Sequence, residues 1–206
     1  MPPKSLKPEV APARTADEPA SSEATGESDE TLMTRFQQGD TRAFEALFQR
    51  YAAPMHGYLV RLTGSPASAE DLAQQTFLSL VRARGRFQAG ARLKPWLYAI
   101  ATNAARDWRR RKRPEELTEA GELPASIPAE SPAPRDTGLE HAVQRALAEL
   151  PEGQRIPIVL HRFEGMSFAE IAESMGLTET AVKVRAHRGY ARLRELLAAL
   201  REETSG

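Results

Sequence analysis

The chain has 206 residues, and its 28 basic and 28 acidic side chains leave a formal net charge of zero. It contains no cysteine, which excludes disulfides, cysteine-ligated metal sites and thiol catalysis. Aromatic residues make up only 6% of the sequence, beside 13 glycines and 15 prolines, so we expect small helical modules joined by loose segments. No apolar run or signal-like segment predicts membrane insertion or secretion, and we expect a soluble, cytoplasmic chain.

Charge is distributed in blocks along the chain. Residues 1–30 carry three basic and seven acidic side chains and five prolines, which is typical of a disordered extension. Residues 82–113 hold eleven basic side chains against one acid, and a second basic cluster spans 183–194. Two basic patches indicate two contact points on a polyanion, although each patch alone is also compatible with a solvated helix face.

These blocks predict the domain organisation. Between the basic patches, residues 114–140 hold five prolines, seven acids and one arginine, which is a linker composition. We therefore divide the chain into a disordered extension (1–30), a helical module (31–113), a linker (114–137), a second helical module (138–201) and a short tail (202–206). The linker of about 24 residues can span roughly 80 Å when extended.

The first module begins with an amphipathic pattern. Asp40 can cap a helix whose apolar positions include Phe44 and Phe48, and which Pro54 and then residues 64–66 interrupt. Ser68 can cap the next helix. The face of that helix opposite its apolar stripe carries polar residues and one leucine, namely Glu70, Asp71, Gln74, Gln75, Leu78 and Arg82. The outward leucine is either an ordinary exposed residue or part of a protein interface.

A loop over 84–94 leads to a third amphipathic segment, where Pro95 suits the first turn of a helix. An apolar stripe that ends at Trp108 is backed by Asn103 and several arginines, which predicts a nucleic-acid surface. Trp96 could provide a stacking plane for a base, but both tryptophans are also expected in a packed core.

The second module contains a helix-turn-helix pattern. Its first helix ends at Pro151, and the next, over 156–163, starts late or is irregular because Pro157 lacks a backbone donor. Ser167 and Glu170 form a capping box, and Gly176 is suited to a left-handed stop. Thr178 caps the following basic helix. An ordinary helical hairpin with a charged face is the alternative. The capping box, the glycine turn and the basic second helix together favour DNA binding in the major groove.

The sequence also resembles a known family. Residues 69–78 (AEDLAQQTFL) look like region 2.2 of the extracytoplasmic-function (ECF) group of the sigma-70 family, and residues 95–103 (PWLYAIATN) are similar to regions 2.3 to 2.4. Residues 150–176 resemble regions 4.1 and early 4.2, and residues 181–188 (AVKVRAHR) resemble the recognition helix. The resemblance implies an all-α fold with two small helical domains, the C-terminal one a helix-turn-helix, and a promoter-specificity subunit of bacterial RNA polymerase.

The resemblance also implies partners and contact residues. The expected partners are core RNA polymerase, through its largest-subunit clamp and second-largest-subunit flap, promoter DNA and an anti-sigma factor. The KVRAHR sequence is similar to subgroups whose anti-sigma factors are membrane-bound. The implied polymerase contacts are Asp71, Gln74, Gln75 and Leu78; the −10 contacts are Arg86, Lys94, Trp96, Asn103, Arg106 and Arg110; the −35 contacts are Thr180, Lys183, Val184, Arg185, His187 and Arg188.

Two other classes of function are alternatives to a sigma factor. A stand-alone helix-turn-helix regulator would bind duplex DNA without polymerase, but it leaves the first module unexplained. An enzyme is disfavoured, because no glycine-rich phosphate loop is present and adjacent Glu70 and Asp71 point in different directions on a helix. The histidines have no metal-ligand spacing; they are His56, His141, His161 and His187. We expect no catalytic residue, metal, cofactor or small-molecule substrate.

Overall fold

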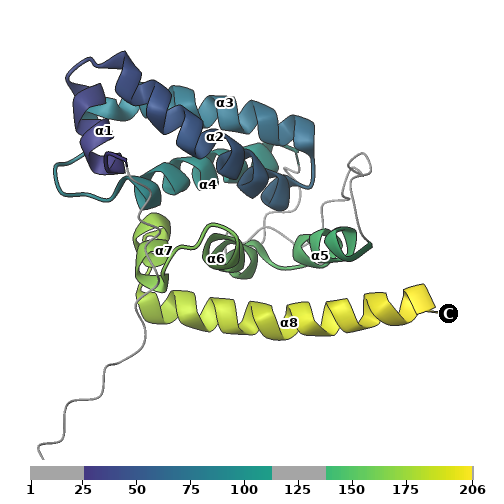
Figure 1. Cartoon of the computed structure of the whole chain (residues 1–206). Helices are drawn as coiled ribbons and strands as arrows, with labels where there is room; N and C mark the ends of the chain where they lie inside the picture. Colours follow the sequence, from purple (N-terminus) through teal and green to yellow (C-terminus); the bar gives the residue numbers. More distant parts are fainter. Residues whose placement is uncertain (1–25, 113–137, 206) are drawn as a thin grey trace, which may run out of the picture.

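The computed structural model describes residues 26–112 and 138–205, and these residues form helices and no strand. The predicted all-α fold is confirmed. The predicted linker and most of the N-terminal extension lie outside the described residues. Figure 1 shows one bundle made of α1 to α4 lying against a second group made of α5 to α8. The bounds in the first bundle are α1 Asp29–Gln37, α2 Thr41–Thr63, α3 Pro66–Ala83, η1 Arg84–Arg86 and α4 Leu93–Lys112.

The start of α2 follows the sequence prediction. The Asp40 carboxylate accepts from the backbone N–H groups of Arg42 and Ala43, at 3.0 and 3.4 Å, and so caps the helix. The expected break at Pro54 is wrong, because α2 continues through this residue to Thr63. A proline inside a helix costs about 3 kcal/mol. Here α2 is held on both sides of Pro54 by buried side chains that include Tyr51 and Met55, so packing outweighs the local penalty.

The predicted cap of α3 is also wrong. The helix begins at Pro66, and its N-cap is Ser65, whose hydroxyl accepts from the backbone N–H of Ser68 at 3.3 Å. Pro66 therefore occupies the first helical position, where its missing N–H has no partner to lose. Gly64 ends α2 in a left-handed conformation with φ of 71°, so the chain turns from α2 into α3 within two residues.

Helix α4 packs on α2 and α3 through the predicted apolar stripe. Leu97, Ala101 and Ala104 are buried, whereas the Trp108 side chain is half-buried. The helix begins at Leu93, two residues before Pro95, and the Glu30 carboxylate accepts from the Leu93 backbone N–H at 3.1 Å. This contact ties α1 to the start of α4, and α1 itself begins two residues before the predicted module boundary at 31.

The second module has the expected helix-turn-helix. Ser167 and Glu170 exchange hydrogen bonds between side chains and backbone, so the capping box is confirmed, and Gly176 is left-handed with φ of 65°. The irregularity expected at Pro157 is not observed, because α6 starts earlier than predicted and continues through this residue. The bounds are α5 Gly138–Ala148, α6 Glu152–Arg162, α7 Phe168–Met175 and α8 Glu179–Ser205, so α8 continues four residues past the predicted module end.

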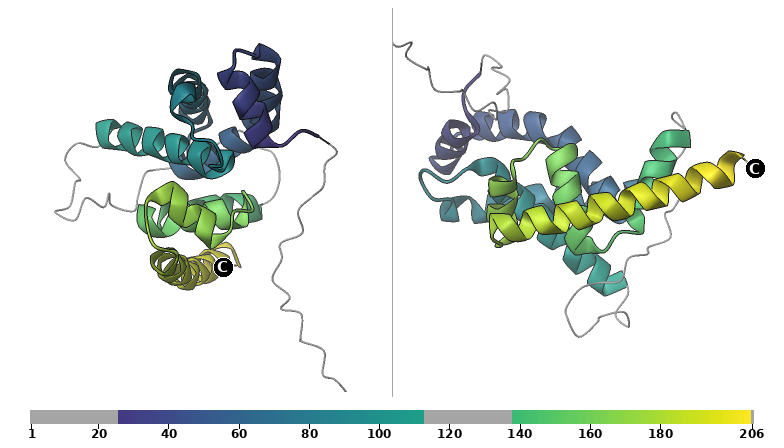
Figure 2. Two further views of the ribbon diagram at one scale, coloured as in Figure 1. Left: turned by 90° about the vertical axis from the view of Figure 1, so that its left-hand side faces the viewer. Right: turned by 90° about the horizontal axis from the view of Figure 1, so that it is seen from below.

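The two modules pack against each other. Helix α7 lies against α4, and α5 and α6 lie against α2, while α8 covers the side of α6 away from the first bundle (Figures 1 and 2). The hydrophobic core accordingly includes residues of both modules. Helix α8 thus lies on the outside of the molecule, whereas one face of α4 lies at the boundary between the modules.

Candidate nucleic-acid and polymerase interfaces

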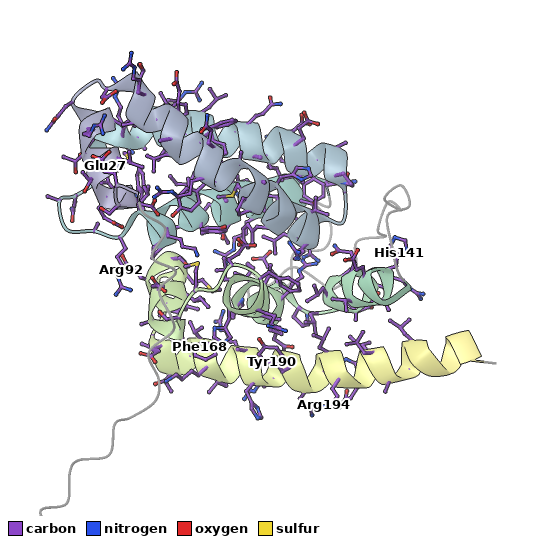
Figure 3. All side chains as sticks on the ribbon, viewed as in Figure 1. Glu27, Arg92, His141, Phe168, Tyr190 and Arg194 are labelled. Atoms are coloured by element: carbon purple, nitrogen blue, oxygen red, sulfur yellow. The ribbon has the colours of Figure 1, made fainter. Side chains whose placement is uncertain are left out.

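The outer face of α8 presents most of the predicted −35 contacts to solvent. The Thr178 hydroxyl accepts from the Ala181 backbone N–H at 3.2 Å and so caps the helix at the turn. Val182 and Ala186 are buried, and this fixes the rotation of the helix. The same outer side carries Arg194 further along the helix (Figure 3). The exposed positions that result are Thr180, Lys183, Val184, His187 and Arg188, while Arg185 is half-buried.

Two of these side chains have informative environments. The Val184 side chain is a rare exposed large apolar residue, with 44% of its surface accessible. Lys183 pairs with Glu179 at 2.7 Å, one helical turn away, and both side chains are about half exposed. Exposed pairs of this kind contribute little to stability, so the Lys183 ammonium can exchange partners with a phosphate or a base at low cost.

The predicted −10 residues lie along α4, except for Arg86, which ends η1. Arg86, Asn103 and Arg110 are exposed. Trp96 is half-buried and packs on Phe87, with ring centroids 5.3 Å apart, so the aromatic plane is partly used by the core. These residues therefore differ in exposure: the charged and amide side chains are open to solvent, whereas the Trp96 ring is partly covered.

Lys94 and Arg106 differ from the other predicted −10 residues because they contact the second module. The Lys94 ammonium donates to the backbone carbonyl of Glu164, and Arg106 Nε lies 2.6 Å from a Glu152 carboxylate oxygen. The hydroxyl of Tyr98, one turn along α4 from Lys94, donates to the Glu164 carboxylate. Sequence reasoning did not find Tyr98 or these glutamates, since no local pattern records which helices meet.

Burial raises the pKa of two groups at this interface. Glu164 is only 9% exposed, and its burial raises the pKa of the carboxyl, although the Tyr98 hydroxyl and the nearby Arg61 oppose that rise. Burial, and then the charge of Glu164, raise the pKa of Tyr98, so its hydroxyl keeps its proton and acts as the donor.

Two buried arginines also lie near the module boundary. Arg109 is 3% exposed and Arg155 is 2% exposed, and burial followed by the charge of Arg109 lowers the pKa of Arg155 to about 10. The Arg155 Nε has no hydrogen-bond acceptor among the described residues. Glu152 and Arg106, which are partly exposed, line one small cavity with them, so side chains of both charges meet where α4 approaches α6.

The predicted polymerase contacts form one exposed face of α3. Asp71, Gln74, Gln75 and Leu78 are all exposed, and Leu78 is 55% accessible. Phe48 on α2 was not expected at this surface: the amphipathic pattern predicts it to be inward-facing, but it is 44% exposed and touches Phe77, with ring centroids 4.8 Å apart. The sequence holds one indication of this exposure. Phe48 directly follows Leu47, which is buried, and adjacent helical residues point in different directions.

These features define a class of protein: a two-module helical protein whose second module presents a basic helix-turn-helix. The Sigma-70 region 2 pattern matches residues 47–115, and the Sigma-70 region 4 pattern matches residues 140–203. RNA polymerase sigma factor CarQ of Myxococcus xanthus is 43% identical over 173 residues, which cover 84% of this chain and 99% of that protein. ECF RNA polymerase sigma factor SigW of Bacillus subtilis is 30% identical, over 79% of this chain and 93% of its own length.

The chain therefore belongs to the ECF group of RNA polymerase sigma factors within the sigma-70 family. Solved structures of sigma factors have a similar fold. One of CnrH in complex with the cytosolic domain of CnrY has a TM-score of 0.65 and 28% identity, covering 83% of this chain and 97% of that one. One of the sigma factor RpoE with the anti-sigma factor NepR from Bartonella quintana has a TM-score of 0.62 and 26% identity, covering 75% and 96%.

Family membership confirms the interpretation as a sigma factor and disfavours the stand-alone regulator, because the first module is matched as region 2. Sigma factors are not a class of enzymes. Within the described ranges, no group of three side chains suited to metal binding occurs, and no helix is both long and apolar enough to cross a bilayer.

Proposed function

We propose that this sigma factor brings core RNA polymerase to promoters by reading a −35 duplex with α8 and a melted −10 strand with α4. The observation that carries the proposal is the ordered pair of family regions, each with a basic helical surface: region 2 around α4 and region 4 around α8. Strand opening needs no chemical step in this chain, because binding to unpaired bases shifts the equilibrium and polymerase supplies the catalysis.

The −35 contacts are proposed on the exposed side of α8. Thr180 and Lys183 lie near the start of the helix, where a recognition helix meets base edges. The exposed Val184 is suited to the methyl group of thymine, and Arg188 is suited to the acceptors of guanine or to phosphate. His187 extends the same exposed face, whereas half-buried Arg185 is better placed for the backbone of the duplex.

The −10 contacts are proposed on α4 and its preceding loop. Exposed Asn103 can read a base edge, and the Trp96 ring can stack on a base beside Phe87. Charged side chains supply contacts to phosphate in this proposal; they are Arg86, Lys94, Arg106 and Arg110. Phosphate contacts of this number make binding steeply salt-dependent.

Polymerase docking is proposed on the exposed face of α3. Leu78 provides an apolar anchor, and Asp71, Gln74 and Gln75 surround it with polar groups, which is the composition of an interface centre and its rim. The largest-subunit clamp is the proposed partner of this face, and the second-largest-subunit flap that of the second module. An anti-sigma factor is a further proposed partner, since the related CnrH and RpoE structures contain CnrY and NepR respectively. The site of action is proposed to be the cytoplasm.

Run-off transcription with purified core polymerase tests the proposal, with the upstream region of this chain's own gene as template. We expect a defined transcript only when the protein is added, and its amount should fall steeply as the salt concentration rises. A specific gel shift on duplex DNA by the isolated protein, without any transcript in the presence of core enzyme, would instead support the stand-alone regulator.

A further inference from the structure

A small cavity lies between α2, α4 and α6. Its apolar wall includes Leu62 of α2 and Ile156 of α6. The charged residues that line it are Arg106, Arg109, Arg155 and Glu152. The cavity has a volume of about 10 Å³, which is close to that of one water-sized sphere. Three cationic side chains and one acid therefore surround a space for a single small ligand.

Arg155 is the residue that points to a ligand. It is only 2% exposed, and its Nε atom has no hydrogen-bond acceptor among the described residues. A buried N–H group without an acceptor has lost its hydration and gained nothing in return, which native proteins normally avoid. Burial, and then the charge of Arg109, lower the pKa of Arg155 to about 10, so the side chain is still cationic at neutral pH. A buried positive charge and a donor in need of an acceptor therefore border the same cavity.

The acid beside the cavity is already engaged. Glu152 is the one carboxylate among the lining residues, and its Oε1 atom accepts from Arg106 Nε at 2.6 Å. The Glu152 charge favours the cationic form of Arg155, but the charge of Arg109 opposes it more strongly. The electrostatic balance at Arg155 therefore favours the entry of a further negative charge.

The first turns of α6 add to the attraction for an anion. The helix begins at Glu152, and its N-cap is Pro151, which supplies no capping side chain. The N-terminal end of a helix carries a partial positive charge, and its first N–H groups favour negative ligands. Arg155 lies near this end of α6, so the helix and the guanidinium group attract the same kind of ligand.

We infer that this cavity is a binding site for one monatomic anion such as chloride, which the Arg155 Nε and the charges of Arg155 and Arg109 hold. A water molecule could accept the same hydrogen bond, but it brings no negative charge to the buried guanidinium. A phosphate or a sulfate has several heavy atoms and exceeds a volume of about 10 Å³. Neither arginine is among the proposed promoter contacts, so the inference goes beyond the proposed function and does not depend on it.

Unfolding of the full chain in two salts tests the inference. Chloride is exchanged stepwise for methanesulfonate, an anion of several heavy atoms, at constant ionic strength so that screening stays equal. A ligand that binds only the folded chain stabilises it in proportion to the logarithm of the ligand concentration, once this exceeds the dissociation constant. We therefore expect the urea midpoint of the wild-type protein to rise in equal steps for each tenfold increase in chloride.

Two variants on α6 locate the effect. Arg155→Met removes the charge and the Nε donor but keeps a long side chain, and buried charges replaced in this way are often tolerated. We expect its urea midpoint to be the same in chloride and in methanesulfonate. Arg162→Met is the control, because Arg162 is exposed on the same helix and its loss changes the net charge equally. The control should keep the chloride dependence of the wild type, and circular dichroism verifies that the helices of both variants are intact.

Trp108 reports on the occupant directly, because its side chain lines the cavity. The chain has two tryptophans, so Trp96→Phe leaves Trp108 as the single one. Bromide, a heavier monatomic anion, quenches the fluorescence of an indole ring that it contacts. In Trp96→Phe we expect a saturable component of quenching that added chloride reverses, and we expect the further change Arg155→Met to abolish this component.

Each measurement has a result that would overturn the inference. A urea midpoint that responds equally to both salts would show screening alone. Chloride dependence that survives in Arg155→Met would place the anion elsewhere, and bromide quenching that is only linear would show collisions from solvent. None of these measurements uses promoter DNA or polymerase, so a negative result removes the anion site and leaves the proposed function untouched.

Discussion

The contact between α6 and α8 sets the position of the recognition helix, and Gly189→Ala tests it. A Cβ added at Gly189 would lie 2.6 Å from Ile158 Cδ1 and 3.2 Å from the backbone oxygen of Gln154. The side-chain methyl can move, but the backbone of α6 cannot do so without shifting the helix. Overpacking of this kind costs about 1–3 kcal/mol. The gain in helix propensity from glycine to alanine returns about 1 kcal/mol. We expect a net loss of unfolding free energy of up to about 2 kcal/mol.

Gly57 supplies the matched control on α2. A Cβ there would meet only the Arg61 Nη1 atom, at 3.0 Å, which is the far end of a flexible side chain. Gly57→Ala should therefore keep its propensity gain and raise the unfolding free energy by about 0.5–1 kcal/mol. Urea unfolding followed by circular dichroism measures both variants. If the urea midpoint of Gly189→Ala rose as much as that of Gly57→Ala, α6 and α8 could not approach each other this closely at Gly189. The position of the recognition helix derived from that contact would then be refuted.

Three further predictions follow from single side chains. Arg188→Ala should weaken −35 binding by the holoenzyme by about 1–3 kcal/mol if the side chain contacts a base, and an equal loss on every promoter variant would show a phosphate contact instead. Leu78→Ala should reduce retention of core polymerase in a pull-down while the circular dichroism spectrum stays unchanged, and undiminished retention would reject the α3 docking face. Burial raises the pKa of Glu170, but hydrogen bonds from Ser167 and the contact with Arg92 outweigh it and hold the pKa below its ordinary range. The stabilisation from this carboxylate is present above the pKa of the unfolded chain and is lost as the pH falls through the folded one. The urea midpoint should therefore fall more on acidification in wild type than in Glu170→Gln, and parallel pH profiles would contradict this.

Local signals in the sequence predicted the parts of the fold that short-range interactions determine. The Asp40 cap, the capping box at Ser167 and the left-handed Gly176 each depend on contacts within a few residues, and the structure confirms all three. The prediction of Ser68 as the N-cap of α3 is wrong because Ser65 and Ser68 are both suitable capping residues. The helix uses Ser65, which places Pro66 at the first helical position. The predicted break of the helix at Pro54 is wrong because tertiary packing outweighs the local penalty of the proline.

The candidate surfaces were predictable only in part. Exposure on α8 followed from helical periodicity, because Val182 and Ala186 had to face inward. The buried Arg109 did not follow from its basic run, yet a run of five consecutive residues covers the whole circumference of a helix, so at least one must face the bundle. The sequence predicts Lys94 and Arg106 to be free phosphate contacts, because their glutamate partners lie 70 and 46 residues away along the chain.

The net charge of zero conceals an uneven distribution of charge over the surface of the second module. The second module is acidic where it meets α4, through Glu152 and Glu164, and basic on the outer side of α8, through Lys183 and Arg188. A duplex that approaches this module is attracted by one side and repelled by the other. Under the proposed function, duplex DNA therefore contacts this module at the outer side of α8 and not at the side that faces α4. The placement of charge selects this side, because the net charge of zero does not distinguish one side of the module from the other.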